Sequence, residues 1–241
     1  PARDEIVCDG YADDDDRVHS LWSIHKSTGR VASSEMTFGN VPKAKIKKQA
    51  DGTFKVIRPN LRRVVVAPRR RVFVEFDFSQ LEARIIAYLS QDPFLLDVFA
   101  NGKDIHTECA RVVFPQFDLL GDGSGKLTKI QKQLRDNVKP LEYGAFYGGS
   151  PETLWKNLLK EGYQLKLEDV VKAVTTLMQR MPGVVTWQRR CVYTASQPPY
   201  EIREQKYGRR RTFPLGQVDQ NEAINFGVQS FAASLMDTGM I

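Results

Sequence analysis

Residues 135–148 read Arg-Asp-Asn-Val-Lys-Pro-Leu-Glu-Tyr-Gly-Ala-Phe-Tyr-Gly. Arg135, Lys139, Tyr143 and Tyr147 recur every four residues, so a helix would place two cations and two aromatic rings along one face. Such a face suits a nucleoside triphosphate, because cations pair with phosphates while an aromatic ring stacks against sugar and base. The pattern alone leaves a second interpretation open, an ordinary amphipathic surface helix.

A second stretch, residues 77–84, reads Asp-Phe-Ser-Gln-Leu-Glu-Ala-Arg and follows an apolar run at 72–76. We expect 72–76 to form a buried strand that ends on Asp77. A carboxylate at the end of a buried strand is held rigidly, and with a neighbouring backbone carbonyl it can coordinate a hard cation such as Mg²⁺. Capping of the following helix by Asp77 is the competing interpretation.

The remaining chain combines a few β-rich runs with many helical patterns. A strand is expected at 17–26, a hairpin at 41–59, and β-rich runs at 61–67 and 71–77. Helices are expected at 80–89, 93–100, 104–114, 126–147 with an interruption at Pro140, 151–161, 167–180, 183–196 and from about 219. A Gly-rich loop at 121–125 and a short polar segment at 200–214 separate them. The predicted fold class is α/β, and within it α+β.

Length and composition set broad limits on the class of protein. The 241 residues, 41% of them hydrophobic, suffice for one large or two small cores. The sequence contains no apolar run near the roughly 20 residues that span a bilayer, and no secretory signal. Its three cysteines include no C-x-x-C pair, which argues against a disulfide framework or a zinc site. We therefore expect a cytoplasmic protein without a membrane partner.

The net charge of +6 is distributed unevenly. Residues 1–16 carry seven acids and one Arg, whereas residues 43–72 carry eleven Lys or Arg and one Asp, a net charge of +10. A basic block of this size can neutralise several phosphates and release their counterions, which favours a nucleic-acid partner. A solvated face or a disordered arm would carry the same charge, so both interpretations stay open.

Both stretches quoted above match patterns of a known family. Residues 77–84 fit D-[YF]-S-x-[IL]-E-x-R at every defined position, and residues 135–148 fit R-x₃-K-x₃-[FY]-G-x₂-Y-G. They resemble motifs A and B of the family A DNA polymerases. Three further segments, at 28–34, 207–211 and 225–233, resemble that family in the same order along the chain.

Motif A carries implied roles in binding metal and nucleotide. The resemblance makes Asp77 a ligand of two catalytic Mg²⁺ ions, with the carbonyl of Phe78 assisting. Glu82 becomes the steric gate beneath the incoming sugar, which leaves no room for a ribose 2′-OH. The same resemblance adds two residues of the motif to the nucleotide-binding set, Ser79 and Gln80. Arg84 is expected to hold the helix by ion pairing.

Motif B supplies the implied nucleotide-binding helix. Arg135 and Lys139 would grip the phosphates, Tyr143 would stack on the incoming nucleotide, and Tyr147 would guard the templating base and contact DNA. With Asp77, the first three of these form the implied catalytic set. The Arg-Asp-Asn start and Tyr143 look more like phage members than bacterial ones. Two residues depart from the family pattern, Pro140 in mid-helix and Glu142 beside Tyr143, and both affect the expected poses of Lys139 and Tyr143.

Other segments carry implied contacts to nucleotide and DNA. His106, in the Gly-x-Asp-Ile-His-Thr stretch at 102–107, would touch the β-phosphate. The expected DNA-binding residues are Arg30 in Thr-Gly-Arg-Val, Asn40, the basic pair Arg62 and Arg63, and Asn225 with Gln229, one turn apart and facing the minor groove of the terminal base pair. The residues alone leave open whether the arginines at 209–211 bind the template or fix the fingers.

Taken together, the resemblance implies template-directed DNA synthesis, in which deoxynucleoside triphosphates extend a primer on a template by two-metal phosphoryl transfer. It implies a right-hand polymerase fold, with a partial palm and its antiparallel sheet at 1–100, helical fingers at 101–218, and the start of a returning palm helix at 219–241.

The second carboxylate of such a site belongs to a His-Asp-Glu motif, motif C, which is not in this sequence. We therefore expect the chain alone to polymerise poorly. One alternative is a split polymerase in which a second polypeptide carries that motif, and another is a non-catalytic nucleic-acid-binding fragment. A single-subunit RNA polymerase is disfavoured by Glu82 and the Thr-Gly-Arg segment.

Overall fold

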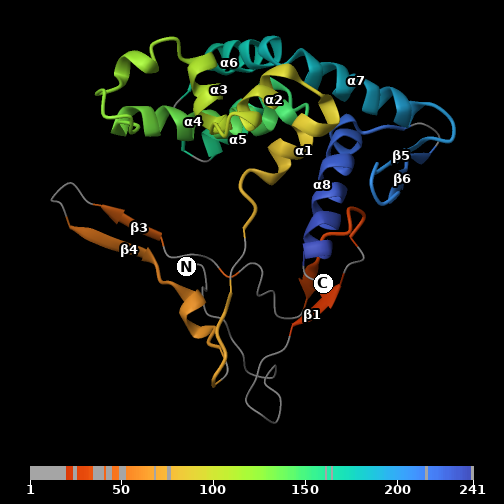
Figure 1. Ribbon diagram of the computed structural model, residues 1–241, viewed down its shortest axis with the longest axis horizontal. Coiled ribbons are helices and arrows are strands. Elements are labelled where there is room, and N and C mark those ends of the chain that lie inside the picture. Colours follow the sequence, from red (N-terminus) through yellow and green to blue (C-terminus); the bar gives the residue numbers. More distant parts are fainter. Residues whose placement is uncertain are drawn as a thin grey trace. The chain divides into compact units, whose positions relative to one another are not determined.

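The computed structural model describes residues 20–23, 26–34, 41, 45–48, 53–67, 69–74, 77–160, 162–163, 165–214 and 217–239. The chain divides into two compact units, Pro1–Asp77 and Phe78–Ile241. In Figure 1 the first unit runs from red to orange and carries short strands, while the second runs from yellow to blue and is mainly helical. The palm and fingers boundaries implied by the family resemblance stay a prediction.

The described part of the first unit contains two antiparallel hairpins. β1 (Leu21–Ser23) pairs with β2 (Ala32–Ser34), and β3 (Lys45–Lys48) pairs with β4 (Phe54–Arg58) (Figure 1). The strand expected at 17–26 is confirmed over β1, and the hairpin expected at 41–59 is confirmed by β3 and β4. Its expected turn at 51–52 lies outside the described residues.

Two strand predictions in the first unit are wrong. The β-rich run at 61–67 begins with a 3-10 helix, η2 (Leu61–Val64), and the apolar run before Asp77 is neither a strand nor buried over its described part. Val72, Phe73 and Val74 are 82%, 65% and 67% exposed. A strand is buried only where neighbouring strands and a covering layer exist. Across the described ranges, every strand pairs within a two-stranded hairpin and none pairs with this run.

The second unit is built from helices and one small hairpin. The structure has α1 (Leu81–Ser90), α2 (Pro93–Ala100), α3 (Ile105–Val113), η3 (Asp118–Leu120), α4 (Lys129–Phe146), α5 (Pro151–Lys160), α6 (Leu167–Arg180), α7 (Pro182–Ser196) and α8 (Gln220–Gly239). The expected α-helices are confirmed, with ends that differ by a few residues. The segment at 200–214, expected as a polar connection, contains the antiparallel strands β5 (Glu201–Arg203) and β6 (Arg210–Thr212).

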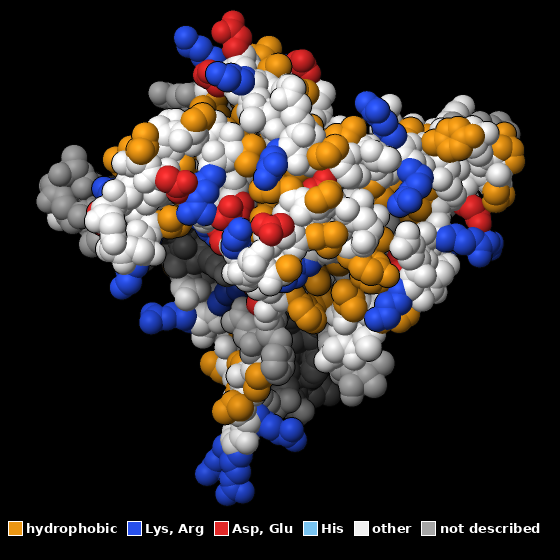
Figure 2. Space-filling model, turned by 45° about the horizontal axis from the view of Figure 1, so that its top comes forward, with side chains coloured by type: hydrophobic (Ala, Val, Ile, Leu, Met, Phe, Trp, Pro, Cys, Tyr) orange, Lys and Arg blue, Asp and Glu red, His pale blue; other side chains and the backbone are white. Residues whose placement is uncertain are grey.

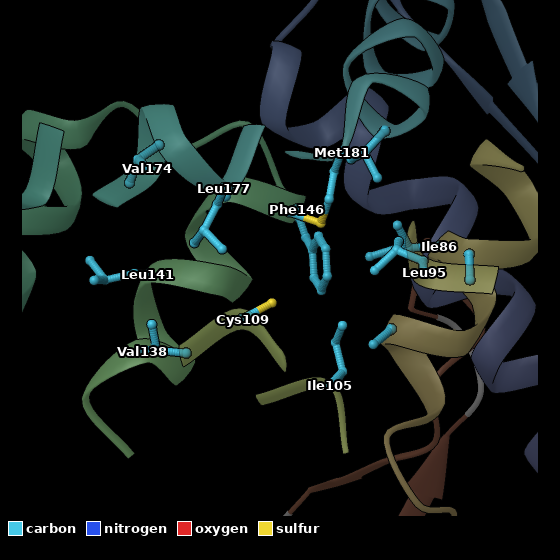
Figure 3. Packing of buried hydrophobic residues seen from close by; sticks show 14 of the residues in the cluster. Ile86, Leu95, Ile105, Cys109, Val138, Leu141, Phe146, Val174, Leu177 and Met181 are labelled. Carbon is cyan, nitrogen blue, oxygen red and sulfur yellow. The ribbon is translucent and has the colours of Figure 1, made fainter. Parts of the chain in front are cut away.

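The main core of the second unit surrounds the last turn of α4. Figure 3 shows the ring of Phe146 between Met181, at the end of α6, and the side chains of Leu95 and Ile86 from α2 and α1. Phe146, Leu95, Ile86 and Met181 are fully buried. Cys109 of α3 extends the same cluster toward Val138 of α4, so the core fixes α3 and α4 side by side.

The interruption predicted at Pro140 is wrong, because α4 continues through it from Lys129 to Phe146. Proline lacks the N–H that would bond four residues back, a loss of about 3 kcal/mol in a regular helix. Burial of apolar side chains on both sides of Pro140 opposes that loss, since Val138 and Leu141 are 0% and 4% exposed. A capping box between Thr128 and Gln131 fixes the start of the helix.

Two arginines of the 207–211 segment attach the small hairpin to α8. Arg209 Nη1 lies 3.4 Å from the hydroxyl oxygens of both Ser230 and Ser234. Arg211 pairs with Glu222 in the first turn of α8. These contacts support the fold-fixing interpretation for both arginines.

The N-cap of α2 provides a stability prediction. Asp92 is fully buried; its Oδ1 accepts from the backbone N–H groups of Phe94 (3.0 Å) and Leu95 (3.3 Å), and its Oδ2 accepts from Gly183 N at 2.8 Å. Asp92→Ala removes the cap and leaves buried donors without partners, so we expect a loss of about 2–4 kcal/mol in the free energy of unfolding. Urea unfolding measures it. Asp97→Ala, at an exposed acid of the same helix, should change stability by less than about 0.5 kcal/mol. Equal losses in the two variants would contradict the capping account.

Among the described residues, no helix combines the length and the apolar composition that crossing a membrane requires.

Candidate functional site

Asp104 joins three segments of the second unit at the start of α3. It caps the helix, because its Oδ2 accepts from the Thr107 backbone N–H at 2.9 Å and the Thr107 hydroxyl at 2.7 Å. Gln80, from the 77–84 motif, donates to Oδ1 at 2.5 Å. Arg135, from α4, donates from Nε to Oδ2 at 2.7 Å and from Nη2 to Oδ1 at 2.9 Å. One carboxylate therefore brings residues from both motifs together.

The pair between Asp104 and Arg135 is firmly charged. Burial raises the pKa of Asp104, but hydrogen bonds from Arg135 and Thr107 outweigh it and hold that pKa well below its usual range. The hydrogen bond from Asp104 also raises the pKa of Arg135. The ion pair thus persists wherever a phosphate ligand carries its negative charges.

The geometry of Arg135 leaves one edge of its guanidinium directed elsewhere. Asp104 takes the edge formed by Nε and Nη2, while Nη1 lies 3.5 Å from Asp136 Oδ1 on the exposed side of α4. A guanidinium has five N–H donors in a rigid fork, so the edge formed by Nη1 and the second Nη2 hydrogen can still meet oxygens of an anion. Asp104 therefore orients the guanidinium of Arg135 and leaves some of its N–H donors available for a ligand.

A second contact between the motifs lies at the end of α4. The Tyr147 hydroxyl donates to Glu82 Oε2, which joins the C-cap of α4 to the first turn of α1. Gly148 follows with φ +71°, where a Cβ would come within 2.8 Å of Ile224 on α8. Glycine is therefore required at this turn, where α4 ends close to α8.

The helical face expected from the four-residue spacing is confirmed, since α4 carries Arg135, Lys139 and Tyr143 and ends at its C-cap Tyr147, and all four side chains are partly buried. Lys139 Nζ pairs with Asp136 at 2.7 Å. The centroid of the Tyr143 ring lies 6.0 Å from that of the His106 ring. Burial, together with the carboxylates of Glu142 and Glu82, raises the pKa of the Tyr143 hydroxyl.

His106 and Glu142 form a buried pair between α3 and α4. His106 Nδ1 lies 2.9 Å from Glu142 Oε2, and the two residues are 7% and 0% exposed. The acid that departs from the family pattern therefore points into the protein, toward His106. Sequence reasoning missed Glu142 as a site residue, and it named Asp104 only in passing, although an Asp immediately before the start of a helix is a capping signal.

The boundary between the two units along the chain falls within the 77–84 motif, after its first residue. Asp77 is the last residue of the first unit and is exposed, and Phe78 and Ser79 at the start of the second unit are exposed as well. Arg84 does not hold α1 by the expected ion pair within the described structure. It donates to the Ser79 carbonyl at 3.0 Å and lies 4.6 Å from the centroid of the Phe99 ring.

The 77–84 motif offers few side chains that could bind a metal ion. Within the described ranges, no three His, Cys, Asp or Glu side chains are grouped so as to hold a metal ion. The Asp77 carboxylate and the Phe78 carbonyl are hard oxygen donors, which suits Mg²⁺ by donor type.

The residues expected to bind DNA are spread over both units. In the first unit Arg30, Arg62 and Arg63 are exposed, Arg62 Nε donates to the Val41 carbonyl at 3.1 Å, and Asn40 lies outside the described residues. In the second unit the half-buried Asn225 and Gln229 lie one turn apart on α8, and Asn225 Oδ1 is buried with no hydrogen-bond partner in the described structure. On the face drawn in Figure 2, basic side chains are spread widely with acidic ones among them, so charge alone marks no DNA path there.

Comparison with known proteins identifies the class to which this fold and this site belong. The family model "DNA polymerase family A" matches residues 6–241. The chain therefore belongs to DNA polymerase family A.

Individual relatives agree with that assignment. The chain is 27% identical over 236 residues to DNA polymerase I of Lactococcus lactis and 28% identical over 237 residues to the thermostable DNA polymerase I of Thermus thermophilus, which covers 95% and 93% of the chain respectively. It spans about a quarter of the length of these curated relatives, 24% and 25%. Among solved structures, the polymerase domain of Pol1 from M. smegmatis, in complex with DNA primer-template and dNTP, matches with a TM-score of 0.67 and 25% identity, over 95% of this chain and 38% of that one.

Proposed function

We propose that this chain is the nucleotide-selecting part of a DNA-directed DNA polymerase, which adds deoxynucleotides to a primer 3′ end on a template. The observation that carries the proposal is the meeting of the two motifs in the second unit, through Gln80, Asp104 and Arg135 at one end and through Glu82 and Tyr147 at the other. Family membership and the M. smegmatis complex with primer-template and dNTP support the same function.

The triphosphate would lie along the partly exposed face of α4. Arg135 would offer the guanidinium edge that Asp104 leaves available, and Lys139 would exchange its exposed partner Asp136 for a phosphate oxygen. An exposed lysine–aspartate pair contributes little stability, so breaking it for the phosphate costs little free energy. Tyr143, beside His106, would then stack on the sugar and base, while Phe78, Ser79 and Gln80 would border the nucleotide from the motif A side.

Metal ions would be bound at the first two residues of the 77–84 motif. Asp77 and the Phe78 carbonyl would hold Mg²⁺ there, and the proposed two ions would activate the primer hydroxyl and stabilise the leaving pyrophosphate. DNA would meet the exposed arginines Arg30, Arg62 and Arg63 of the first unit, and the amides of Asn225 and Gln229 on α8. Asn225 Oδ1, buried and without a partner, is a suitable acceptor for a hydrogen bond from a base edge.

Sugar selection provides the test of this function. Glu82 is fixed by the Tyr147 hydroxyl, so its carboxylate would occupy the space that a ribose 2′-OH needs. In primer extension by the intact protein with Mg²⁺, we expect Glu82→Ala to reduce the preference for deoxynucleotides, expressed as a ratio of kcat/KM values, by about 100-fold.

The matched control removes a carboxylate from outside the proposed site. Glu108→Ala, at an acid on α3 that pairs with Arg111, should leave the preference unchanged. Primer extension with an unaltered preference in Glu82→Ala would contradict the sugar-selecting role. Failure of the intact wild-type protein to extend any primer, even with a second polypeptide that carries motif C, would contradict the proposed polymerase function itself.

A further inference from the structure

Glu142 is an acid whose side chain is buried inside the protein. Burial of a carboxylate costs free energy of folding, so its presence here needs an explanation. It is fully buried on α4, its Oε2 bonds to His106 Nδ1 at 2.9 Å, and its Oε1 has no hydrogen-bond partner in the described structure. Its carboxylate also lies beside the buried Cys109 thiol, whose pKa is raised by burial and by Glu142. A buried polar pair is often no more stabilising than well-packed apolar side chains in place of both partners.

The geometry of the pair determines what His106 can present. An ionised carboxylate beside Nδ1 accepts a hydrogen bond from that nitrogen, so Nδ1 carries the hydrogen. The two ring nitrogens diverge, so Nε2 is directed away from Glu142. The His106 ring also packs beside the Tyr143 ring, with the two centroids 6.0 Å apart. Tyr143 lies on the same face of α4 as Arg135 and Lys139.

We propose that Glu142 is a positioning residue, which holds the His106 ring with Nδ1 protonated and Nε2 aimed at the phosphate groups of the incoming nucleotide. This inference rests on the proposed function, because the phosphate role of His106 does. With Nδ1 committed to the carboxylate, His106 can donate from Nε2 to a phosphate oxygen only as an imidazolium. The negative charge of Glu142 then balances the charge of that imidazolium inside the protein.

A structural role and a positioning role of Glu142 predict different values of KM when an apolar residue replaces it, although both predict a loss of stability. Glu142→Leu removes one partner and leaves the buried Nδ1–H of His106 without an acceptor, so the urea midpoint of the intact protein should fall. If Glu142 positions His106, the same variant should raise KM for a deoxynucleotide roughly tenfold with little change in kcat. Glu142→Gln retains an oxygen that accepts from Nδ1, so it should keep KM within about threefold of wild type.

Two further variants separate positioning from general damage. In a His106→Ala background, Glu142→Leu should add nothing to the rise in KM, because the residue that Glu142 positions is gone. Glu204→Gln changes another buried acid, which accepts from the backbone N–H groups of Lys206 and Tyr207 in the small hairpin. It should lower the urea midpoint and leave KM unchanged.

The wild-type protein offers a readout that depends on no variant folding. The ¹⁵N shifts of the His106 ring should report a hydrogen on Nδ1, in the neutral tautomer or in the imidazolium. A bare Nδ1 with the hydrogen on Nε2 would overturn the proposal, and so would an unchanged KM in Glu142→Leu when His106→Ala raises it. If the wild-type protein incorporates no nucleotide, even with a second polypeptide that carries motif C, the proposed function fails, and this inference fails with it.

Discussion

Asp77→Asn should abolish nearly all nucleotide incorporation while leaving the fold intact. Asn keeps the size of the side chain and one of its oxygens but loses the charge that a divalent cation requires of its ligand. We expect kcat in primer extension to fall about 1,000-fold, equivalent to ~4 kcal/mol of lost transition-state stabilisation. Asp77 is exposed, so the urea midpoint should change little.

The control for Asp77 makes the same chemical change at an exposed acid elsewhere. Asp122→Asn, in the Gly-rich loop before α4, should retain wild-type incorporation. Retention of more than about a tenth of the wild-type kcat by Asp77→Asn would remove Asp77 from the proposed metal site.

Arg135→Lys should show the second largest effect, although the charge is conserved. Lysine is a point charge on a flexible stem, so it cannot meet Asp104 through two parallel hydrogen bonds and offer a second edge to a phosphate. We expect kcat/KM for a deoxynucleotide to fall about 100-fold, or ~2.7 kcal/mol, with most of the loss in KM.

Arg111→Lys is the matched substitution outside the site. Arg111 also bridges two carboxylates, those of Glu108 and Asp118, and it belongs to neither of the two sequence motifs. It should leave kcat/KM near the wild-type value. Equal losses in the two variants would mean that Arg135 acts through the fold and not through the nucleotide.

Features fixed by local chemistry could be predicted from the sequence. The start of α2 follows from Asp92 as N-cap and Pro93 at the first helical position, and the structure has both. The common face of Arg135, Lys139, Tyr143 and Tyr147 follows from helical spacing alone.

Features that depend on distant partners could not be predicted from local patterns. Asp104 and Arg135 are 31 residues apart, and His106 and Glu142 are 36 apart, so no spacing rule connects them. Acids are rarely fully buried, which made Glu142 look like a disturbance beside Tyr143 and not a partner of His106. The buried strand predicted over the apolar run is wrong because residues 72–74 are exposed. Burial of a strand depends on neighbouring elements that its own sequence does not specify.

The helix interruption predicted at Pro140 is wrong for a different reason. The backbone argument was sound locally, since proline removes one hydrogen bond, but the helix is held by side chains packed on either side of it. Tertiary packing overrode an intrinsic preference of a few kcal/mol.

The central claim is that the incoming nucleotide lies on the exposed face of α4, and photocrosslinking with 8-azido-dATP tests it most directly. Trypsin does not cleave between Lys139 and Pro140, so the peptide that carries Tyr143 and Tyr147 spans residues 136–156. We predict that the label on the intact protein with Mg²⁺ and primer–template concentrates in that peptide and is displaced by excess dATP but not by deoxyadenosine. Labelling that is confined to other peptides, or that deoxyadenosine displaces equally well, would contradict the account.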